Sequence, residues 1–220
     1  MEELIKEKCP TPARYQKNKL IKRIFKEYPF LKKKYFLDIC GAGEILNFLD
    51  KFKMNGEGVD LSKDACEIAE KRVSERIKVK QGDFMELKNK KYGLIIMVDI
   101  LEHIKDDDAF VKKANELLED EGYYLINVPA KMKLYGNQDT YFGHYRRYEK
   151  DEMSKLLERN EFEIIKFWSY GFASFSKIFS FLMKGKVKDE KKENTLQSGI
   201  KTPKFMIYIY ILLQENFIGL

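Results

Sequence analysis

The sequence predicts a doubly wound α/β fold, in which a mostly parallel sheet carries helices on both faces. Three observations support this prediction. Strand and helix patterns alternate four times between residues 35 and 128, with short connections. The run 92–98 is apolar throughout, which is typical of a strand covered on both faces. Glycines and an acid follow the first strand directly, where doubly wound sheets bind ligands.

The elements follow in chain order from their periodicity. Residues 14–28 place apolar side chains at helical spacing between lysines and arginines, which predicts an amphipathic helix. The predicted strands are short and mostly apolar: 35–39, 56–60, 76–81, 92–98 and 123–128. The helices predicted between them span 45–52, 63–76 and 107–118.

The alternation stops after Pro129. A polar and aromatic loop is expected over 130–148, followed by a helix over 150–159 and a strand over 161–168. Farther on, residues 171–183 have a helical pattern, and the apolar stretch after Pro203 is expected to be a buried helix.

Three parts are therefore expected. Residues 1–34 form an N-terminal helical segment, 35–170 the ligand-binding domain, and 171–220 a C-terminal helical, lid-like region. The family resemblance described below implies a last antiparallel strand after this region, so the chain is expected to be truncated there or to receive that strand differently.

Composition excludes several classes of protein. Hydrophobic residues make up 44% of the 220 residues and charged residues 35%, which is typical of a soluble globular chain. The apolar run 205–213 is shorter than the roughly 18 residues that a membrane span needs, and the N-terminus lacks a signal-peptide core. A cytoplasmic location is expected. Three unpaired cysteines exclude a disulfide scaffold, and a net charge of +6 does not require nucleic acid as a partner.

A nucleoside site is predicted at the strand ends. Asp38, Asp60 and Asp83 end or follow the first three strands, and Gly41 and Gly43 occupy the first strand-to-helix turn. A turn without side chains allows a ligand to approach the backbone. Asp60 lies nineteen positions after Gly41, the spacing of an acid that accepts hydrogen bonds from a ribose diol.

A dinucleotide fits this turn less well. The full fingerprint needs a third glycine, where this chain has Leu46. Glu44 would also repel a pyrophosphate at the helix N-terminus. A cationic or zwitterionic nucleoside is therefore preferred, and NAD is the weaker alternative.

These segments resemble the class I S-adenosylmethionine-dependent methyltransferases from about Tyr35 to Trp168. The matching pieces are FLDICGAGE, GVDLSKDACEIAEKR, QGDF, YGLIIMVDILEHI with EDEGYYLINVP, and FGHYRRY, the last similar to a segment of a type-11-like branch. The resemblance implies a Rossmann-like, seven-stranded, mostly parallel sheet and S-adenosylmethionine as cofactor.

The resemblance also assigns residues to the cofactor. Gly41 and Gly43 would line its methionine and ribose part, Asp60 would hold the ribose hydroxyls, and Asp83 with Phe84 would bracket adenine. The other residues expected at the cofactor are Asp38, Cys40, Leu61 and Asp99. Cys40 stands in the family's Asp-x-Gly-x-Gly-x-Gly turn where a glycine is usual, or one glycine is deleted, so a tighter turn and weaker cofactor affinity are expected.

Both histidines of the chain fall where strand-end chemistry is expected. Asp99, Glu102 and His103 form a D-x-x-E-H arrangement after the fourth strand, and His144 begins HYRRY. If the segment after Asp99 is helical, Asp99 shares a face with Glu102 or His103. His103, His144 and Glu102 are therefore the candidate catalytic residues, with His103 as a general base or substrate orienter.

A metal is the less favoured alternative at these residues. The arrangement resembles the E-x-x-E-H metal site of ubiquinone-type O-methyltransferases and of small-RNA 2′-O-methyltransferases, which also use a later histidine. By that resemblance, the ligands of a divalent ion would be Asp99, Glu102, His103 and His144. Asp99 replaces the first glutamate of the pattern, and its reach is one methylene shorter.

The expected function is methyl transfer to a small molecule, preferably to an oxygen rather than a nitrogen or carbon atom. Two alternatives stay open. One is a non-catalytic nucleoside-binding module. The other is an RNA methyltransferase, in which Arg146, Arg147 and the lysines of 184–192 would contact phosphates.

The acceptor is expected to have an apolar or aromatic body. Aromatic side chains outside the regular sheet pattern either build a lid core, which is preferred, or contact this acceptor: Tyr135, Tyr141, Phe142, Tyr145, Phe172, Phe175 and Phe179. The run 205–213 would give weak contact with a membrane surface. The oligomeric state is left open.

Overall fold

The structure, a computed structural model, describes residues 12–39 and 43–168. Two compact units divide the chain: residues 1–24 with 167–220, and residues 25–166. The sheet and every candidate site residue within the described ranges belong to the second unit. Predictions about residues 171–220, including the apolar run 205–213, lie outside the described residues.

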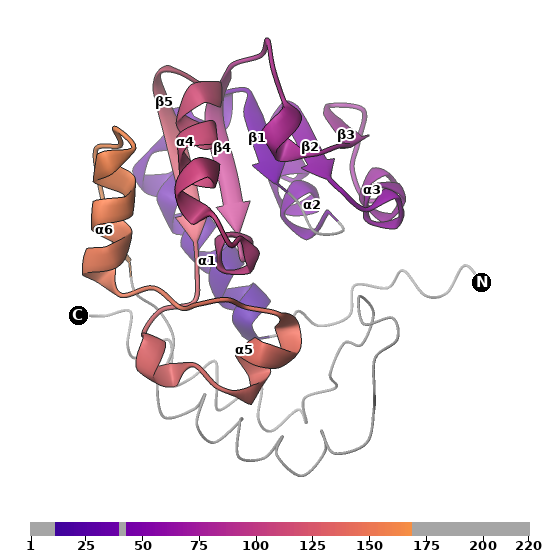
Figure 1. Cartoon of the computed structure of the whole chain (residues 1–220). Coiled ribbons are helices and arrows are strands. Elements are labelled where there is room, and N and C mark those ends of the chain that lie inside the picture. Colours follow the sequence, from indigo (N-terminus) through magenta and orange to yellow (C-terminus); the bar gives the residue numbers. More distant parts are fainter. Residues whose placement is uncertain (1–11, 40–42, 169–220) are drawn as a thin grey trace. The chain divides into compact units, whose positions relative to one another are not determined.

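Within the described residues, five parallel strands form a sheet in the order β3-β2-β1-β4-β5 (Figure 1). They are β1 (Phe36–Ile39), β2 (Gly56–Asp60), β3 (Ile77–Gln81), β4 (Tyr92–Val98) and β5 (Leu118–Asn127). The strand order reverses between β1 and β4, so the carboxyl ends of these two strands mark the topological switch point. The predicted doubly wound, Rossmann-like architecture is confirmed.

Helices connect and flank the strands. The α-helices are α1 (Pro12–Glu27), α2 (Glu44–Asp50), α3 (Lys63–Glu70), α4 (Asp107–Leu117), α5 (Asn137–Phe142) and α6 (Lys150–Arg159). Short 3₁₀ helices are η2 (Pro29–Lys33), η3 (Phe84–Glu86), η4 (Leu101–His103) and η5 (Met132–Leu134). Side-chain caps explain two of the starts: Ser62 accepts from the Ala65 amide before α3, and Asp106 from the Ala109 amide before α4.

Four predicted elements differ clearly from the observed ones, and the first is the helix predicted over 63–76, which ends at Glu70. β5 begins at Leu118 rather than at residue 123, because Leu118 pairs with Tyr92 before the register shifts. The expected loop 130–148 contains α5 and η5. Residues 163–168, predicted to lie in a strand, have no regular structure. A strand needs a hydrogen-bonded neighbour, and no described strand pairs with this segment.

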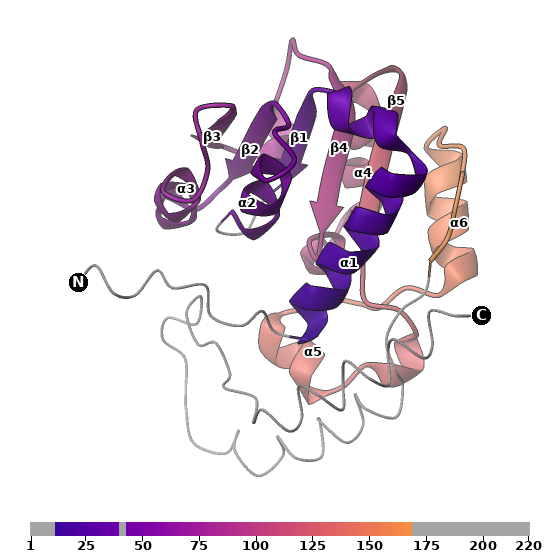
Figure 2. The same ribbon diagram turned by 180° about the vertical axis from the view of Figure 1, so that it is seen from behind.

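The core has two layers, one on each face of the sheet. On one face, Leu37 and Ile95 pack with buried residues of α4 and α6. On the other face, Phe36 lies over Gly56, where an added Cβ would come within 2.5 Å of the ring. Figures 1 and 2 show α4 on the first face and α2 on the second. The alternation of side chains along β1 therefore places Asp38 on the α2 face.

One buried acid on β2 links this strand to β3 and, across β1, to the start of β4. Glu57 of β2 is 4% exposed and accepts hydrogen bonds from Tyr92, Lys80 and Lys90 at 2.9, 3.1 and 2.7 Å. Burial alone would raise the pKa of Glu57, but these hydrogen bonds outweigh it and lower the pKa from 4.5 to about 2.

Within the described residues, no helix combines the length and apolar character needed to cross a bilayer. The segment 130–148 lies beyond the carboxyl ends of β4 and β5, where it can cover ligand chemistry at the strand ends (Figure 1).

Candidate functional site

A buried acid begins the first strand-to-helix turn. Asp38 is 1% exposed and lies in β1 between Gly58 of β2 and Ile96 of β4. Neither of its carboxylate oxygens has a hydrogen-bond partner among the described residues. Burial, and to a smaller extent the charge of Asp60, raise the pKa of Asp38 from 3.8 to about 8. An unpartnered buried carboxyl group is costly, which indicates a place for a ligand rather than core packing.

The glycine that ends this turn has a packing role that the sequence did not reveal. Gly43 has a φ of 73° and caps α2. A Cβ added to Gly43 would lie 2.6 Å from the Cβ and 2.7 Å from the Cα of Ala69 in α3. The residue is therefore glycine because of its left-handed backbone and the close approach of α3. Cys40 and Gly41, the other expected turn residues, lie outside the described residues.

The end of β2 presents an acid and an apolar side chain. Asp60 is half-buried, and its Oδ1 accepts a hydrogen bond from the Ser62 amide at 2.8 Å. Burial raises the pKa of Asp60, whereas this hydrogen bond lowers it. Ser62 caps α3, so Asp60 is not needed as the helix cap. The neighbouring Leu61 is 70% exposed, which leaves an apolar face beside the acid.

The end of β3 differs from the expectation at one position. Asp83 caps η3 and accepts from the Met85 amide at 2.8 Å, as an acid in a tight turn does. The Phe84 side chain, expected to bracket adenine, is only 3% exposed and packs against Phe110, with 4.7 Å between ring centroids. That expectation is wrong for its ring, because the hydrophobic core takes it up.

The end of β4 also corrects the sequence analysis. Asp99 has a left-handed φ of 55°, and the 3₁₀ helix η4 begins only at Leu101. Asp99 therefore does not share a helical face with Glu102 or His103. Its Oδ1 accepts a hydrogen bond from Asn127 Nδ2 at 2.5 Å, which ties it to the end of β5.

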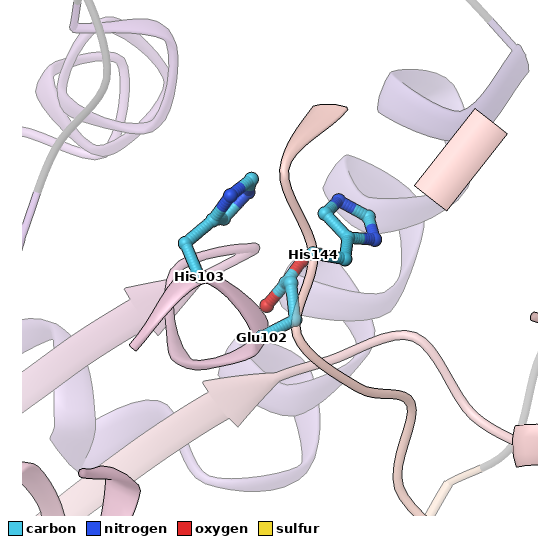
Figure 3. A group of neighbouring side chains, drawn as sticks. All are labelled: Glu102, His103 and His144. Atoms are coloured by element: carbon cyan, nitrogen blue, oxygen red, sulfur yellow. The ribbon is translucent and has the colours of Figure 1, made fainter. Parts of the chain in front are cut away.

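Two histidines and a glutamate meet beyond the end of β4. Figure 3 shows Glu102 and His103 on η4, and His144 on the segment that follows α5. One ligand atom from each of the three residues lies within 4.8 Å of the other two. The imidazole rings are perpendicular, with centroids 4.6 Å apart. Three of the four residues proposed from sequence for a metal are thus brought together, and Asp99 is not part of the group.

The surroundings of His103 favour its neutral form near pH 7. Partial burial lowers its pKa, and the charge of His144 lowers it further. The charge of Asp99 and a hydrogen bond with the Gly143 backbone act in the opposite direction without cancelling the effect. A neutral imidazole has one nitrogen that can accept a proton or bind a metal.

His144 is held by a residue that sequence reasoning missed. Its Nδ1 lies 2.9 Å from Oδ1 of Asp139, which is 1% exposed. Burial alone would raise the pKa of Asp139, but hydrogen bonds from Arg147, Gly136 and His144 lower it below its ordinary value. No periodic pattern marks Asp139, because it lies in a short helix inside a segment that reads as a loop.

The two arginines of HYRRY have internal partners. Arg147 Nε lies 2.8 Å from Asp139 Oδ1, and Arg146 Nη1 lies 2.7 Å from Asp107 Oδ2. Tyr148 is buried and donates to the same Asp107 oxygen at 3.0 Å. The motif therefore attaches the segment 130–148 to α4. Both of its guanidinium groups pair with carboxylates of the chain itself, which does not favour a role in binding phosphates.

Exposed aromatic side chains lie on the same segment as His144, and the Phe142 ring stacks on its imidazole with 6.2 Å between centroids. Tyr141, Phe142 and Tyr145 are 54%, 48% and 56% exposed. The hydroxyl of Tyr135 instead donates to the carbonyl of His144 at 2.6 Å, which is a structural contact. Phe172, Phe175 and Phe179 lie outside the described residues.

Comparisons with known proteins identify the family of this domain. A sequence model of the methyltransferase-domain family matches residues 11–166. The ubiquinone biosynthesis O-methyltransferase of Pelagibacter ubique is 32% identical over 124 residues, which cover 53% of this chain and 52% of that protein. The chain thus spans about half the length of this curated relative.

Solved structures show the same fold. The magnesium protoporphyrin IX methyltransferase of Synechocystis with bound SAH has a TM-score of 0.60 at 16% identity, covering 70% of this chain and 75% of that chain. The O-methyltransferase family 2 protein of Planctomyces limnophilus in complex with apigenin has a TM-score of 0.55 at 18% identity, covering 60% and 46%.

The family model covers residues 11–166, which is most of the chain, and the solved structures share its fold. The chain therefore belongs to the methyltransferase-domain family, among the class I S-adenosylmethionine-dependent methyltransferases.

Proposed function

We propose that this protein transfers a methyl group from S-adenosylmethionine to an oxygen atom of a small molecule with an apolar or aromatic body. The observation that carries the proposal is the placement of an imidazole pair at the end of β4, beside strand ends that carry acids suited to a nucleoside. Family membership supports the cofactor, and the residues named below support the acceptor chemistry.

The acids at the strand ends fit the cofactor. The unpartnered oxygens of Asp38 can accept hydrogen bonds from the ammonium group of the cofactor. Asp60 can accept hydrogen bonds from the ribose hydroxyls of the cofactor. The exposed side chain of Leu61 can pack on the adenine ring, and Asp83 can accept from the adenine amine. When bound, S-adenosylmethionine supplies a methyl group activated by a sulfonium.

The histidine pair fits the acceptor side. A hydroxyl group must lose its proton as its oxygen is methylated, and a neutral imidazole within reach can take that proton. His103 has a lowered pKa and lies next to His144, so it is the proposed general base, while His144 orients the acceptor. Aligning the acceptor and excluding water are then the chain's main contributions.

The exposed aromatic side chains on the segment of His144 support an apolar acceptor. The exposed rings of Tyr141, Phe142 and Tyr145 offer faces on which an aromatic body can stack. Two similar proteins, the ubiquinone biosynthesis O-methyltransferase and the protein in complex with apigenin, are O-methyltransferases by name. An acceptor of this kind is therefore preferred over RNA, because Arg146 and Arg147 are engaged in internal ion pairs.

A second candidate mechanism rests on the Glu102, His103 and His144 group. A carboxylate with two neutral imidazoles suits a divalent ion of the first transition row. An ion held there would lower the pKa of the acceptor hydroxyl and orient it. The proximity of the three ligand atoms favours this candidate, and the absence of Asp99 from the group leaves it with fewer protein ligands.

Calorimetric titration tests the cofactor. S-adenosylmethionine and S-adenosylhomocysteine should both bind, and NADH should not. Asp60→Ala should weaken binding by about 1.5–3 kcal/mol, because it removes charged hydrogen bonds. Asp120→Ala, which removes an exposed acid, is the matched control and should bind as the wild type does. Binding of NADH without binding of either sulfonium-derived ligand would refute the proposal.

Methyl transfer from labelled S-adenosylmethionine to a panel of hydrophobic phenols tests the reaction. Activity that survives exhaustive chelation but is lost in His103→Ala supports the base, whereas loss to a chelator and recovery with magnesium or another divalent ion supports the metal. Full activity in both His103→Ala and His144→Ala would exclude the group from catalysis. Cofactor binding without transfer to any acceptor would instead favour a nucleoside-binding module.

A further inference from the structure

The carboxylate of Asp139 receives three hydrogen bonds from three different parts of its segment. Oδ1 accepts from Arg147 Nε at 2.8 Å and contacts His144 Nδ1 at 2.9 Å, while Oδ2 accepts from the Gly136 amide at 2.9 Å. A backbone hydrogen bond joins the same two residues, since the His144 amide donates to the Asp139 carbonyl at 2.9 Å. The acid is buried, so water does not compete for these contacts.

The partners determine where the protons are. A guanidinium is always charged and donates only, and a backbone amide also donates only. Both carboxylate oxygens of Asp139 thus face obligate donors, and the arginine charge is in direct contact. An ionised carboxylate has no proton to give, so the His144 Nδ1 atom must be the donor in their hydrogen bond.

We propose that Asp139, held by Arg147, is a positioning residue that fixes His144 as its Nδ1–H tautomer, so that its Nε2 atom presents a lone pair at the site beside His103. This inference rests on the proposed function for its purpose, but the tautomer itself is a property of the chain alone. A histidine whose second nitrogen is held by a carboxylate keeps its ring orientation and gains basicity at the other nitrogen.

This arrangement explains why so polar a cluster is largely buried within the segment 130–148. Without the carboxylate, a neutral imidazole can carry its proton on either nitrogen, and only one of the two forms can accept from an acceptor hydroxyl through Nε2. Asp139 removes the unproductive form before any ligand arrives. The pairing of Arg147 with Asp139 in turn prevents the acid from being a buried charge without a partner.

The chain is well suited to a direct test, because it contains only two histidines. Long-range ¹H–¹⁵N correlation spectra of the full chain, recorded with chelator and without cofactor or substrate, report which nitrogen of each ring is protonated. The spectrum of His103→Gln assigns the remaining ring to His144. In the neutral form of His144 we expect a protonated Nδ1 and an unprotonated Nε2 in the wild type, and a mixture of both tautomers in Asp139→Asn. Asp120→Asn is the matched control and should leave the spectrum unchanged.

Kinetics add a readout that a merely structural role would not move. In Asp139→Asn, kcat should fall about tenfold to a hundredfold, as in other losses of a carboxylate behind a histidine. The KM for S-adenosylmethionine should stay unchanged, because Asp139 lies outside the proposed cofactor residues.

The outcomes separate this inference from the proposed function. A neutral His144 ring that carries its proton on Nε2 in the wild type overturns it, even if Asp139→Asn fails to fold. An Asp139→Asn variant with mixed tautomers and wild-type kcat overturns the positioning role. Failure of methyl transfer in every assay would refute the proposed function, and the wild-type spectrum would still decide the tautomer.

Discussion

Replacing Asp38 by asparagine should make the protein more stable at neutral pH while weakening its cofactor site. Asparagine has nearly the same shape but cannot ionise. In the wild type, the pKa of Asp38 is raised from 3.8 to about 8 by burial and by the charge of Asp60. Its two oxygens have no hydrogen-bond partner among the described residues that could offset the cost of a charge.

The magnitude follows from proton linkage. Between pH 3.8 and about 8 the folded state holds a proton on Asp38 that the unfolded state has lost. Wild-type stability therefore falls as pH rises through this window, by about 1.4 kcal/mol per pH unit. At pH 7 the accumulated loss is about 4 kcal/mol. Asparagine avoids this loss, and its unpaired amide costs about as much as the protonated acid.

Urea unfolding of wild type and Asp38→Asn, without cofactor, measures the effect between pH 4 and pH 8. The stability difference should be near zero at pH 4 and increase toward pH 7. Asp120→Asn should show no such trend. S-adenosylmethionine binding to Asp38→Asn should weaken about tenfold or more, as expected when a charged hydrogen bond is lost. A stability difference that is independent of pH would refute the reasoning on Asp38 ionisation, and unchanged binding would remove it from the cofactor site.

Three further predictions concern the frame around the site. Glu57→Gln should have the opposite pH dependence: the lowered pKa of Glu57 contributes at most about 3 kcal/mol above pH 4.5, which is lost as pH falls toward 2, so wild type and variant should converge in acid unfolding. Gly43→Ala should cost about 2–4 kcal/mol from its left-handed φ and the contact with α3, and an undiminished Tm would contradict this reading. Tyr148→Phe should cost about 1 kcal/mol in urea unfolding, with the same strand content by circular dichroism.

Much of the fold could be predicted from periodicity. The strands could be predicted because neighbouring residues on a strand face opposite sides of the sheet. The run 92–98 is apolar at every position, which indicates a strand buried on both faces, as β4 is. The acids at strand ends were also predictable, since a strand that is followed at once by a glycine or an acid places that residue at the carboxyl edge.

Other properties needed the tertiary structure. Gly43 was expected to be small for a ligand, but the packed helix α3 is what excludes a side chain. Phe84 follows a strand as a binding residue would, yet its ring enters the core because Phe110 of α4 lies beside it. Local sequence cannot distinguish these cases, because both depend on what another element brings within a few ångströms.

The candidate catalytic group of Glu102, His103 and His144 could also be predicted only in part. The sequence by itself determined that Glu102 and His103 follow the fourth strand and that His144 lies in a polar segment. Only the tertiary structure decided that the two histidines meet, that Asp99 stays apart and that Asp139 holds His144. Periodicity describes which face a residue takes on its own element, whereas the distance between side chains 41 positions apart depends on how the segment 130–148 packs over the strand ends.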